Sequence, residues 1–244
     1  MTDMSRKQPS YKTYIETLNR ISKAITSEIY LGDLLKLIVT LTANMMKAKI
    51  CSLWVLDEKT GRLAIRATQA MSKEYLKERS LKLGEGVVGL VAKEKKPIII
   101  QNILKSDAYK EKKLAKKEKL ISMLSVPMMI KKRVIGVINC YTTTQYKFTG
   151  SDTALLSTVA NQAAVAIENT ELLVKTRVVL EELEARKKIE KAKGILMQEQ
   201  KLTEADAYNL MRKSSMDKRV HMKEIAEAII LSSEIKKISG KNSA

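Results

Sequence analysis

The stretch from Arg186 to Ile230 decides how this sequence is interpreted, and it reads RKKIEKAKGILMQEQKLTEADAYNLMRKSSMDKRVHMKEIAEAII. Its apolar residues recur three or four positions apart in three successive segments, which is the spacing of amphipathic helices. The apolar positions are Ile189, Ala192 and Leu196 in the first segment, Ala207, Leu210 and Met211 in the second, and Ile225, Ala226, Ile229 and Ile230 in the third. Three short helices that each bury one such stripe form a small bundle.

The second segment carries a helix-start signal. Thr203 is a favourable N-cap residue, and Asp206 three positions later can answer it as a short capping box. Tyr208, Arg212 and Ser215 fall on a face of this helix that is separate from the apolar stripe. The sequence therefore predicts an exposed face that combines an aromatic, a cationic and a small residue.

This unit resembles the ANTAR domain, the antiterminator module at the end of many bacterial response proteins. The resemblance is carried by Arg186, Ile189, the run Ala192–Met197, the run Glu204–Tyr208, Leu210, Arg212, Ser215, Met216, Ile225 and Ala226. It implies binding to paired RNA hairpins in nascent transcripts, which prevents terminator formation. The residues by themselves indicate a basic three-helix module and leave RNA, DNA and protein open as partners.

RNA hairpin loops expose unstacked bases, which proteins read through edge hydrogen bonds and through stacking on aromatic or arginine planes. Such a surface needs cations for phosphates, a planar side chain, and small residues that allow close approach. The expected RNA-binding residues are Lys188, Lys193, Arg212, Lys213 and Arg219 as cations, Tyr208 as the planar group, and Gly194, Ala207 and Ser215 as small residues. Structural roles stay open for the same residues, as solvated charges, a tyrosine that caps the core, or helix-packing positions.

Composition places the chain among globular proteins. Its 244 residues give room for one medium domain and a small appendage, and 45% of them are hydrophobic. No apolar run reaches the length of a membrane-spanning helix, and the first ten residues are polar, without the apolar region of a secretory signal. We therefore expect a cytoplasmic protein with no membrane partner.

The net charge of +18 favours association with a polyanion without identifying one. Most of the positive excess precedes Lys175, notably in Lys93–Lys96 and Lys105–Lys119, so the C-terminal module is not the most basic region. Lysine-rich surfaces are also found as ordinary solvated faces.

Residues 11–174 show a mixed pattern of helices and strands. Helical spacing at Ile15–Ile25 and Leu34–Met45 precedes strand-like runs and a helix that begins near Ser151. The expected strands are Cys51–Leu56, Leu63–Ala67 after a hairpin turn, Pro97–Ile100, Met123–Ile130 and Val134–Tyr141. This order predicts an α+β fold with an antiparallel sheet flanked by helices.

This part of the chain resembles the GAF family. The resemblance is carried by Leu83–Gly89, Ser125–Pro127, Ile135–Ile138, Phe148 and Thr149 with Asp152, and Gln162–Asn169. It implies a sensor fold, whose ligands across the family include cyclic nucleotides, tetrapyrroles, iron and small organic molecules. Any pocket is expected to draw on Leu53, Ala67, Val87, Ile98 and Met123, and the glycine-rich loop Gly84–Gly89 is interpreted as a structural turn in preference to a phosphate site.

Several cofactors are disfavoured, so the ligand stays unknown. The single histidine, His221, belongs to the C-terminal module, which argues against a haem ligand in the sensor. Two cysteines, Cys51 and Cys140, cannot hold a cubane iron–sulfur cluster within one chain, and their positions do not suggest a disulfide framework. The residues around Phe148 lack the asparagine and glutamate of the cyclic-nucleotide signature.

The two parts share a continuous helical pattern, since no glycine or proline interrupts residues 151–193. Leu172, Val179 and Leu183 recur at coiled-coil spacing, which predicts a connector over residues 175–190 and a parallel homodimer. A single amphipathic helix that lies on its own domain is the alternative. A ligand that repacks the end of the sensor would then alter the separation or register of two effector modules, here assigned to residues 186–235.

Two other function classes stay open. A small basic bundle also suits a DNA-binding regulator. A GAF-type redox enzyme would use Cys51 or Cys140, but the sensor has no Cys-x-x-Cys and no histidine to assist a nucleophile. The expected function is a non-enzymatic regulator in which a GAF sensor controls an ANTAR antiterminator.

Overall fold

The computed structural model describes residues 11–27, 29–70 and 79–241. The polar start of the chain, residues 1–10, lies outside the described residues. The chain divides into two compact units at the bond between Glu171 and Leu172.

The first unit is built on a six-stranded sheet in the order β3-β2-β1-β6-β5-β4, with every neighbouring pair antiparallel. The strands are β1 (Ile50–Asp57), β2 (Arg62–Thr68), β3 (Ser80–Lys82), β4 (Ile98–Ile100), β5 (Ser122–Ile130) and β6 (Arg133–Thr142). The predicted α+β fold is therefore confirmed. The strand β3 was not predicted, because three residues are too few to show a periodic pattern.

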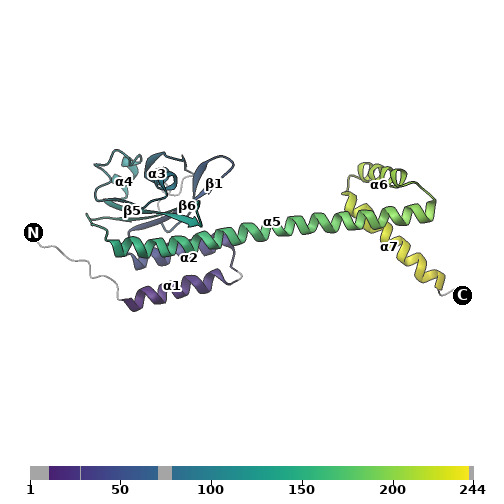
Figure 1. Cartoon of the computed structure of the whole chain (residues 1–244), viewed down its shortest axis with the longest axis horizontal. Coiled ribbons are helices and arrows are strands. Elements are labelled where there is room, and N and C mark those ends of the chain that lie inside the picture. The colour runs from purple at the N-terminus through teal and green to yellow at the C-terminus, as the bar shows by residue number, and fades with distance from the viewer. Residues whose placement is uncertain (1–10, 28, 71–78, 242–244) are drawn as a thin grey trace, which may run out of the picture. The chain divides into compact units, whose positions relative to one another are not determined.

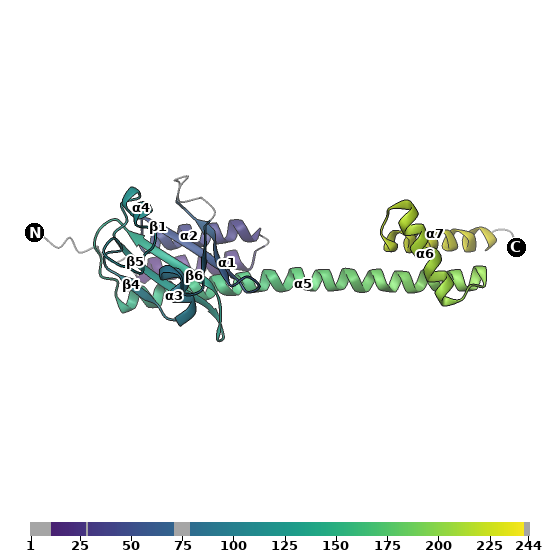
Figure 2. The ribbon, with the colours of Figure 1, turned by 90° about the horizontal axis from the view of Figure 1, so that it is seen from above.

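Helices cover both faces of the sheet (Figures 1 and 2). One face packs against α1 (Tyr11–Ile25), α2 (Leu31–Met45) and the first part of α5 (Gly150–Gln200). The other face packs against α3 (Gly86–Glu94) and α4 (Lys112–Lys117). Each face has its own apolar core, because successive side chains of a strand point to opposite sides.

The glycine-rich loop before α3 is a turn whose conformation only glycine adopts readily. Gly84 and Gly86 have φ angles of +82° and +61°, and a Cβ atom on Gly89 would lie 2.4 Å from the carbonyl oxygen of Lys82. The loop also bonds to itself: the N–H of Gly84 donates to the oxygen of Gly89 at 2.8 Å, and that of Gly89 donates to Glu85 at 3.0 Å. These backbone groups are satisfied internally, which supports the interpretation as a structural turn.

Helix α5 is 51 residues long and passes through Gly194 without a break. Asp152 fixes its first turn, since its carboxylate accepts from the N–H of Thr149 at 2.8 Å and from the hydroxyl of Tyr146 at 3.1 Å. The predicted continuous helix is confirmed, and the first of the three expected short helices is the end of this long one.

The second unit combines the end of α5 with α6 (Glu204–Lys218) and α7 (Met222–Lys241). Its buried core consists of Ala192, Leu196, Ala207, Met211, Ile225 and Ala226. Leu210, expected to point inward, is 40% exposed, whereas Ala207 and Met211 are the buried residues of α6. Thr203 is the N-cap of α6 as predicted, and its hydroxyl accepts from the N–H of Asp206 at 3.2 Å.

Candidate nucleic-acid interface

Helix α6 presents one exposed stripe of aromatic and cationic side chains. Tyr208 and Arg212, four residues apart, lie on one side of the helix, and Arg219 is the residue that follows its last turn. The tyrosine is 43% exposed and both arginines are exposed. Among the described residues, no carboxylate pairs with Arg212, with Arg219 or with the neighbouring Lys213. This stripe, Tyr208, Arg212 and Arg219, thus offers a planar group and cations that no internal partner occupies.

The C-terminal end of α6 shapes the last part of this stripe. Arg219 follows the helix in the left-handed conformation with φ of 53°, and its N–H donates to the oxygen of Met216. Ser215 is partly buried, and its hydroxyl donates to the oxygen of Val220 at 2.6 Å. Ser215 therefore fixes the turn that presents Arg219, and its hydroxyl is occupied within the chain.

Lys193 lies almost buried between two helices. Its ammonium is 2.7 Å from Glu204 on α6 and 2.9 Å from Glu190 on α5, and its side chain is only 9% exposed. The hydrogen bond to Glu204, followed by that to Glu190, raises the pKa of Lys193, and the same contact lowers the pKa of Glu204. The structure thus places Lys193 in an interhelical ion pair, where the sequence suggested a phosphate contact.

Lys188 has a comparable place between α5 and α7. Its ammonium lies 2.7 Å from Glu227, and this hydrogen bond raises the pKa of Lys188. Two further pairs join the same helices, Lys191 with Glu234 at 3.0 Å and Lys236 with Glu199 at 2.8 Å. Sequence reasoning missed this set of pairs, because nothing local along the chain indicates which turns of two helices will meet.

The two remaining small residues differ in their surroundings. Ala207 is fully buried in the core of the second unit, where its small side chain lets the helices approach. Gly194 is different, because a Cβ atom placed on it would have no atom of the chain within 4 Å. Packing within the chain therefore gives a reason for alanine at 207 but no reason for glycine at 194.

A groove with a volume of about 330 Å³ lies between the three helices of the second unit. Leu210 and Lys218 of α6 line it together with Ile195 of α5 and Ile229 of α7. Lys218 is exposed and was not among the expected site residues, although its place in the last turn of a basic helix could have suggested it.

In the first unit, the five residues expected around a pocket lie on opposite faces of the sheet. Leu53 and Ala67 belong to the core under α1, α2 and α5. Val87, Ile98 and Met123 belong to the core under α3 and α4. The five cannot line one cavity, because the alternation of strand side chains separates them by the thickness of the sheet.

Comparison with known proteins identifies both units. Residues 31–168 match the GAF domain family and residues 179–230 match the ANTAR domain. This chain belongs to the GAF family and carries a C-terminal ANTAR domain. The predicted two-domain architecture is confirmed.

Three relatives illustrate these matches. The phosphoenolpyruvate-dependent phosphotransferase system protein of Escherichia coli K12 is 25% identical over 155 residues, which are 64% of this chain and 21% of that protein. The GAF domain of an Acinetobacter phosphoenolpyruvate-protein phosphotransferase has 27% identity and a TM-score of 0.58, covering 72% of this chain and 99% of that domain. The transcriptional regulatory protein PdtaR of Mycobacterium tuberculosis is 42% identical over 50 residues, 20% of this chain and 24% of that protein. The chain thus spans about a fifth to a quarter of the length of the curated relatives it matches.

The GAF domain keeps its two cysteines inside the core. Cys51 on β1 and Cys140 on β6 are paired across the two strands, and both are fully buried free thiols. Burial, together with the neighbouring Cys140, raises the pKa of Cys51 well above its ordinary value. A thiol must ionise to act as a nucleophile, so this environment does not suit the redox chemistry that the sequence left open.

Within the described ranges, no three histidine, cysteine, aspartate or glutamate side chains come together as a metal site. No helix in the described part of the chain has the length and apolar character needed to cross a membrane.

Proposed function

We propose that this chain is an ANTAR-type transcription regulator that binds paired RNA hairpins in nascent transcripts and prevents terminator formation. The observation that carries the proposal is the unpaired stripe of Tyr208, Arg212 and Arg219 on α6, in a domain of the ANTAR family. Tyr208 would stack on a looped-out base, and the arginines would contact phosphates or base edges. Lys213 adds a cation beside the stripe.

Gly194 completes the proposed surface. A glycine inside a helix lowers the stability of the helix, and no close contact within the chain requires a glycine at position 194. Close approach of a partner's backbone supplies the missing reason. Lys188, Lys193, Ala207 and Ser215 would act indirectly, by holding α5, α6 and α7 in the arrangement that presents the stripe.

We also propose that the regulator works as a parallel homodimer through α5. Apolar residues between Leu172 and Leu183 are 47% to 71% exposed in the single chain: Leu172, Leu173, Val174, Val178, Val179, Leu180 and Leu183. Water contact with so many apolar side chains on one helix is unfavourable, and a second copy would bury those along the stripe of Leu172, Val179 and Leu183. Two ANTAR domains would then face two hairpins, in the cytoplasm where transcripts are made, and a small-molecule ligand of the GAF domain would bias this arrangement.

A titration that compares nucleic acids tests the proposed function. The full chain is titrated at fixed salt with a labelled RNA of two hairpins and with duplex DNA of the same number of phosphates. We expect the RNA to bind at least about tenfold more tightly, and to retain a preference at 0.2 M salt where contacts to phosphates weaken. Equal or tighter binding to the DNA would favour the DNA-binding regulator. Addition of the chain to a transcription reaction across the same hairpins should increase read-through.

A further inference from the structure

A second groove lies in the GAF domain, beside the start of the glycine-rich loop, and has a volume of about 800 Å³. It is lined by the turn between β5 and β6, by Glu58 after β1 and by the end of α3. Leu56, Leu83 and Ile130 give it an apolar floor, and Leu83 is 45% exposed there. Nothing in the proposed contact with RNA uses this groove.

Cations surround that floor. Lys93, Lys95, Lys131 and Lys132 line the groove together with Arg133, against two carboxylates, those of Glu58 and Glu168. The ammonium of Lys95 donates to the oxygen of Lys132 at 2.8 Å, which ties α3 to the β5–β6 turn. Where the structure describes the chain, Lys93, Lys131 and Lys132 form no ion pair with a carboxylate. Like charges gathered without counter-charges repel each other, and an anion relieves this repulsion.

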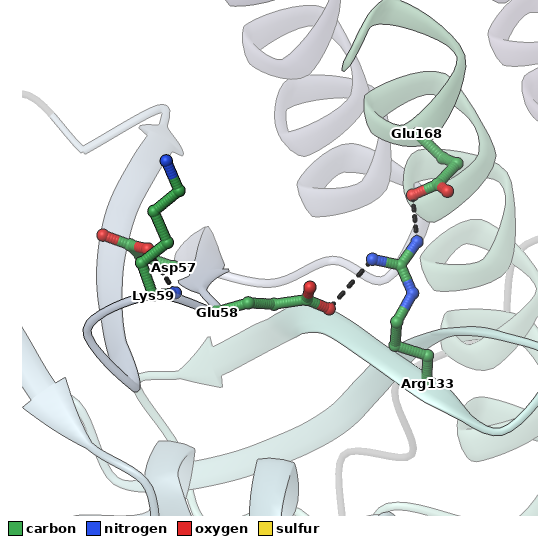
Figure 3. A network of polar contacts seen from close by, with 5 residues as sticks. All are labelled: Asp57, Glu58, Lys59, Arg133 and Glu168. Carbon is green, nitrogen blue, oxygen red and sulfur yellow. Dashed lines mark hydrogen bonds and ion pairs between the residues drawn. The ribbon is translucent and has the colours of Figure 1, made fainter. Parts of the chain in front are cut away.

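Arg133 joins three parts of the domain at the edge of the groove (Figure 3). One nitrogen of its guanidinium lies 2.9 Å from Glu58, and another donates to Glu168 on α5. The turn that carries Glu58 is itself fixed, because the carboxylate of Asp57 accepts from the N–H of Lys59 at 2.9 Å. Arg133 is therefore held by two carboxylates that a bound anion could replace.

We propose that this groove binds an organic phosphate, a small molecule with several phosphate charges and an apolar or planar portion. The lysines and Arg133 would hold the phosphates, and the apolar portion would cover Leu56, Leu83 and Ile130. A simple inorganic anion would contact only the cations and leave Leu83 exposed to water. Its binding would therefore gain no free energy from burial of the apolar floor. The combination of cationic rim and apolar floor is what selects this chemical class.

Binding there would have a consequence for α5. The phosphates compete with Glu168 for the guanidinium of Arg133, and release of Glu168 would loosen a contact between the β5–β6 turn and the long helix. The groove as a binding site is independent of the RNA proposal. Only the effect of occupancy on RNA capture depends on the proposed function.

Calorimetry on the full chain at 0.15 M salt tests the site, with ATP and tripolyphosphate as the probes. We expect one saturable ATP site per chain, and weaker binding of tripolyphosphate although its charge is comparable. The variant Lys93→Gln/Lys132→Gln should weaken ATP binding about tenfold, the size of a change of two cation contacts at a partly exposed site. The matched control Lys113→Gln/Lys116→Gln removes the same charge from the exposed face of α4, outside the groove, and should change the affinity less than about twofold.

Glu168→Gln tests the exchange at Arg133 separately. Removal of the competing carboxylate should tighten ATP binding several-fold, whereas a groove that ignores Arg133 would show no change. Any of three results would overturn the proposal. They are no saturable ATP binding, an equal loss of ATP affinity in the groove variant and in the α4 control, and binding of tripolyphosphate as tight as that of ATP. Circular dichroism checks that each variant is folded. If Lys93→Gln/Lys132→Gln does not fold, the single variant Lys131→Gln is used in its place. If hairpin RNA displaces ATP and the groove variant loses RNA affinity equally, the groove is a contact for RNA and the proposal fails.

Discussion

The ammonium of Lys193 lies 2.7 Å from Oε1 of Glu204, and this contact joins α5 to the first residue of α6. A carboxylate in the first turn of a helix is also favoured by the helix dipole, so Glu204 has two sources of stabilisation. Its position explains why Lys193 is part of the scaffold of the ANTAR domain.

Glu204→Gln should lower the thermal unfolding midpoint of the ANTAR domain by at most a few degrees, since Glu204 is largely exposed and Glu190 still pairs with Lys193. The effect should depend on pH. Glu204 has a lowered pKa, so its contribution is present above its ordinary value of 4.5 and is lost as the pH falls through the lowered value. Lys193 has a raised pKa, so its contribution is complete below 10.5 and is lost only as the pH rises through the raised value. Differential scanning calorimetry should find the wild-type and Glu204→Gln midpoints separated at neutral pH and progressively closer as the pH falls below 4.5.

The control for this prediction is Glu182→Gln, which changes an exposed glutamate of α5 that takes no part in the ion pairs between α5, α6 and α7. It should leave the midpoint unchanged at every pH. A separation between the midpoints of wild type and Glu204→Gln that stays constant as the pH is lowered far below 4.5 would contradict the role of the ionised pair.

Arg212→Ala should weaken hairpin RNA binding by about tenfold, because one exposed, unpaired guanidinium leaves the proposed contact surface. The helical content should not change, since Arg212 contacts no described carboxylate. A fluorescence titration measures the first quantity and circular dichroism the second. Lys113→Ala removes one charge from the GAF domain and serves as the control. Equal losses of RNA affinity in both variants would mean that the effect comes from net charge alone.

Gly194→Ala should move stability and RNA affinity in opposite directions. The new methyl group meets no atom within 4 Å, so the variant gains helix stability of about 0.5–1 kcal/mol. RNA affinity should fall several-fold if the RNA backbone approaches this position. Gly150→Ala in the first turn of α5 also adds a methyl group in open space and should leave RNA binding unaltered. Unchanged RNA affinity in Gly194→Ala would remove this residue from the interface.

Leu172→Glu/Val179→Glu should convert the proposed dimer to a monomer, because two charges at coiled-coil positions cannot be buried without partners. Sedimentation velocity should give the mass of two chains for the wild type and of one chain for the variant. Glu181→Gln/Glu182→Gln on the polar side of the same segment is the control, and should keep the dimer. A wild-type monomer at high concentration, also with RNA present, would refute the dimer.

The sequence by itself determined most of the elements and both families, but not the short elements β3 and α4. Period-two alternation in residues 51–56 predicted β1, helical spacing of apolar residues predicted α1, α2 and the helices of the ANTAR domain, and Thr203 marked the start of α6. Absence of glycine and proline over residues 151–193 predicted one continuous helix. These signals are local, because each depends on residues a few positions apart.

Only the tertiary structure decided which side of each element has a partner. It placed Lys188 and Lys193 in ion pairs with Glu227 and Glu204, buried Ala207, exposed Leu210, and separated Leu53 from Met123 by the sheet. It also brought Lys93 and Glu168 into one groove with Arg133, although these three residues are far apart along the chain. The physical reason is that a charge or an apolar side chain acquires its role from neighbours brought together by packing, and no spacing along the sequence encodes those neighbours.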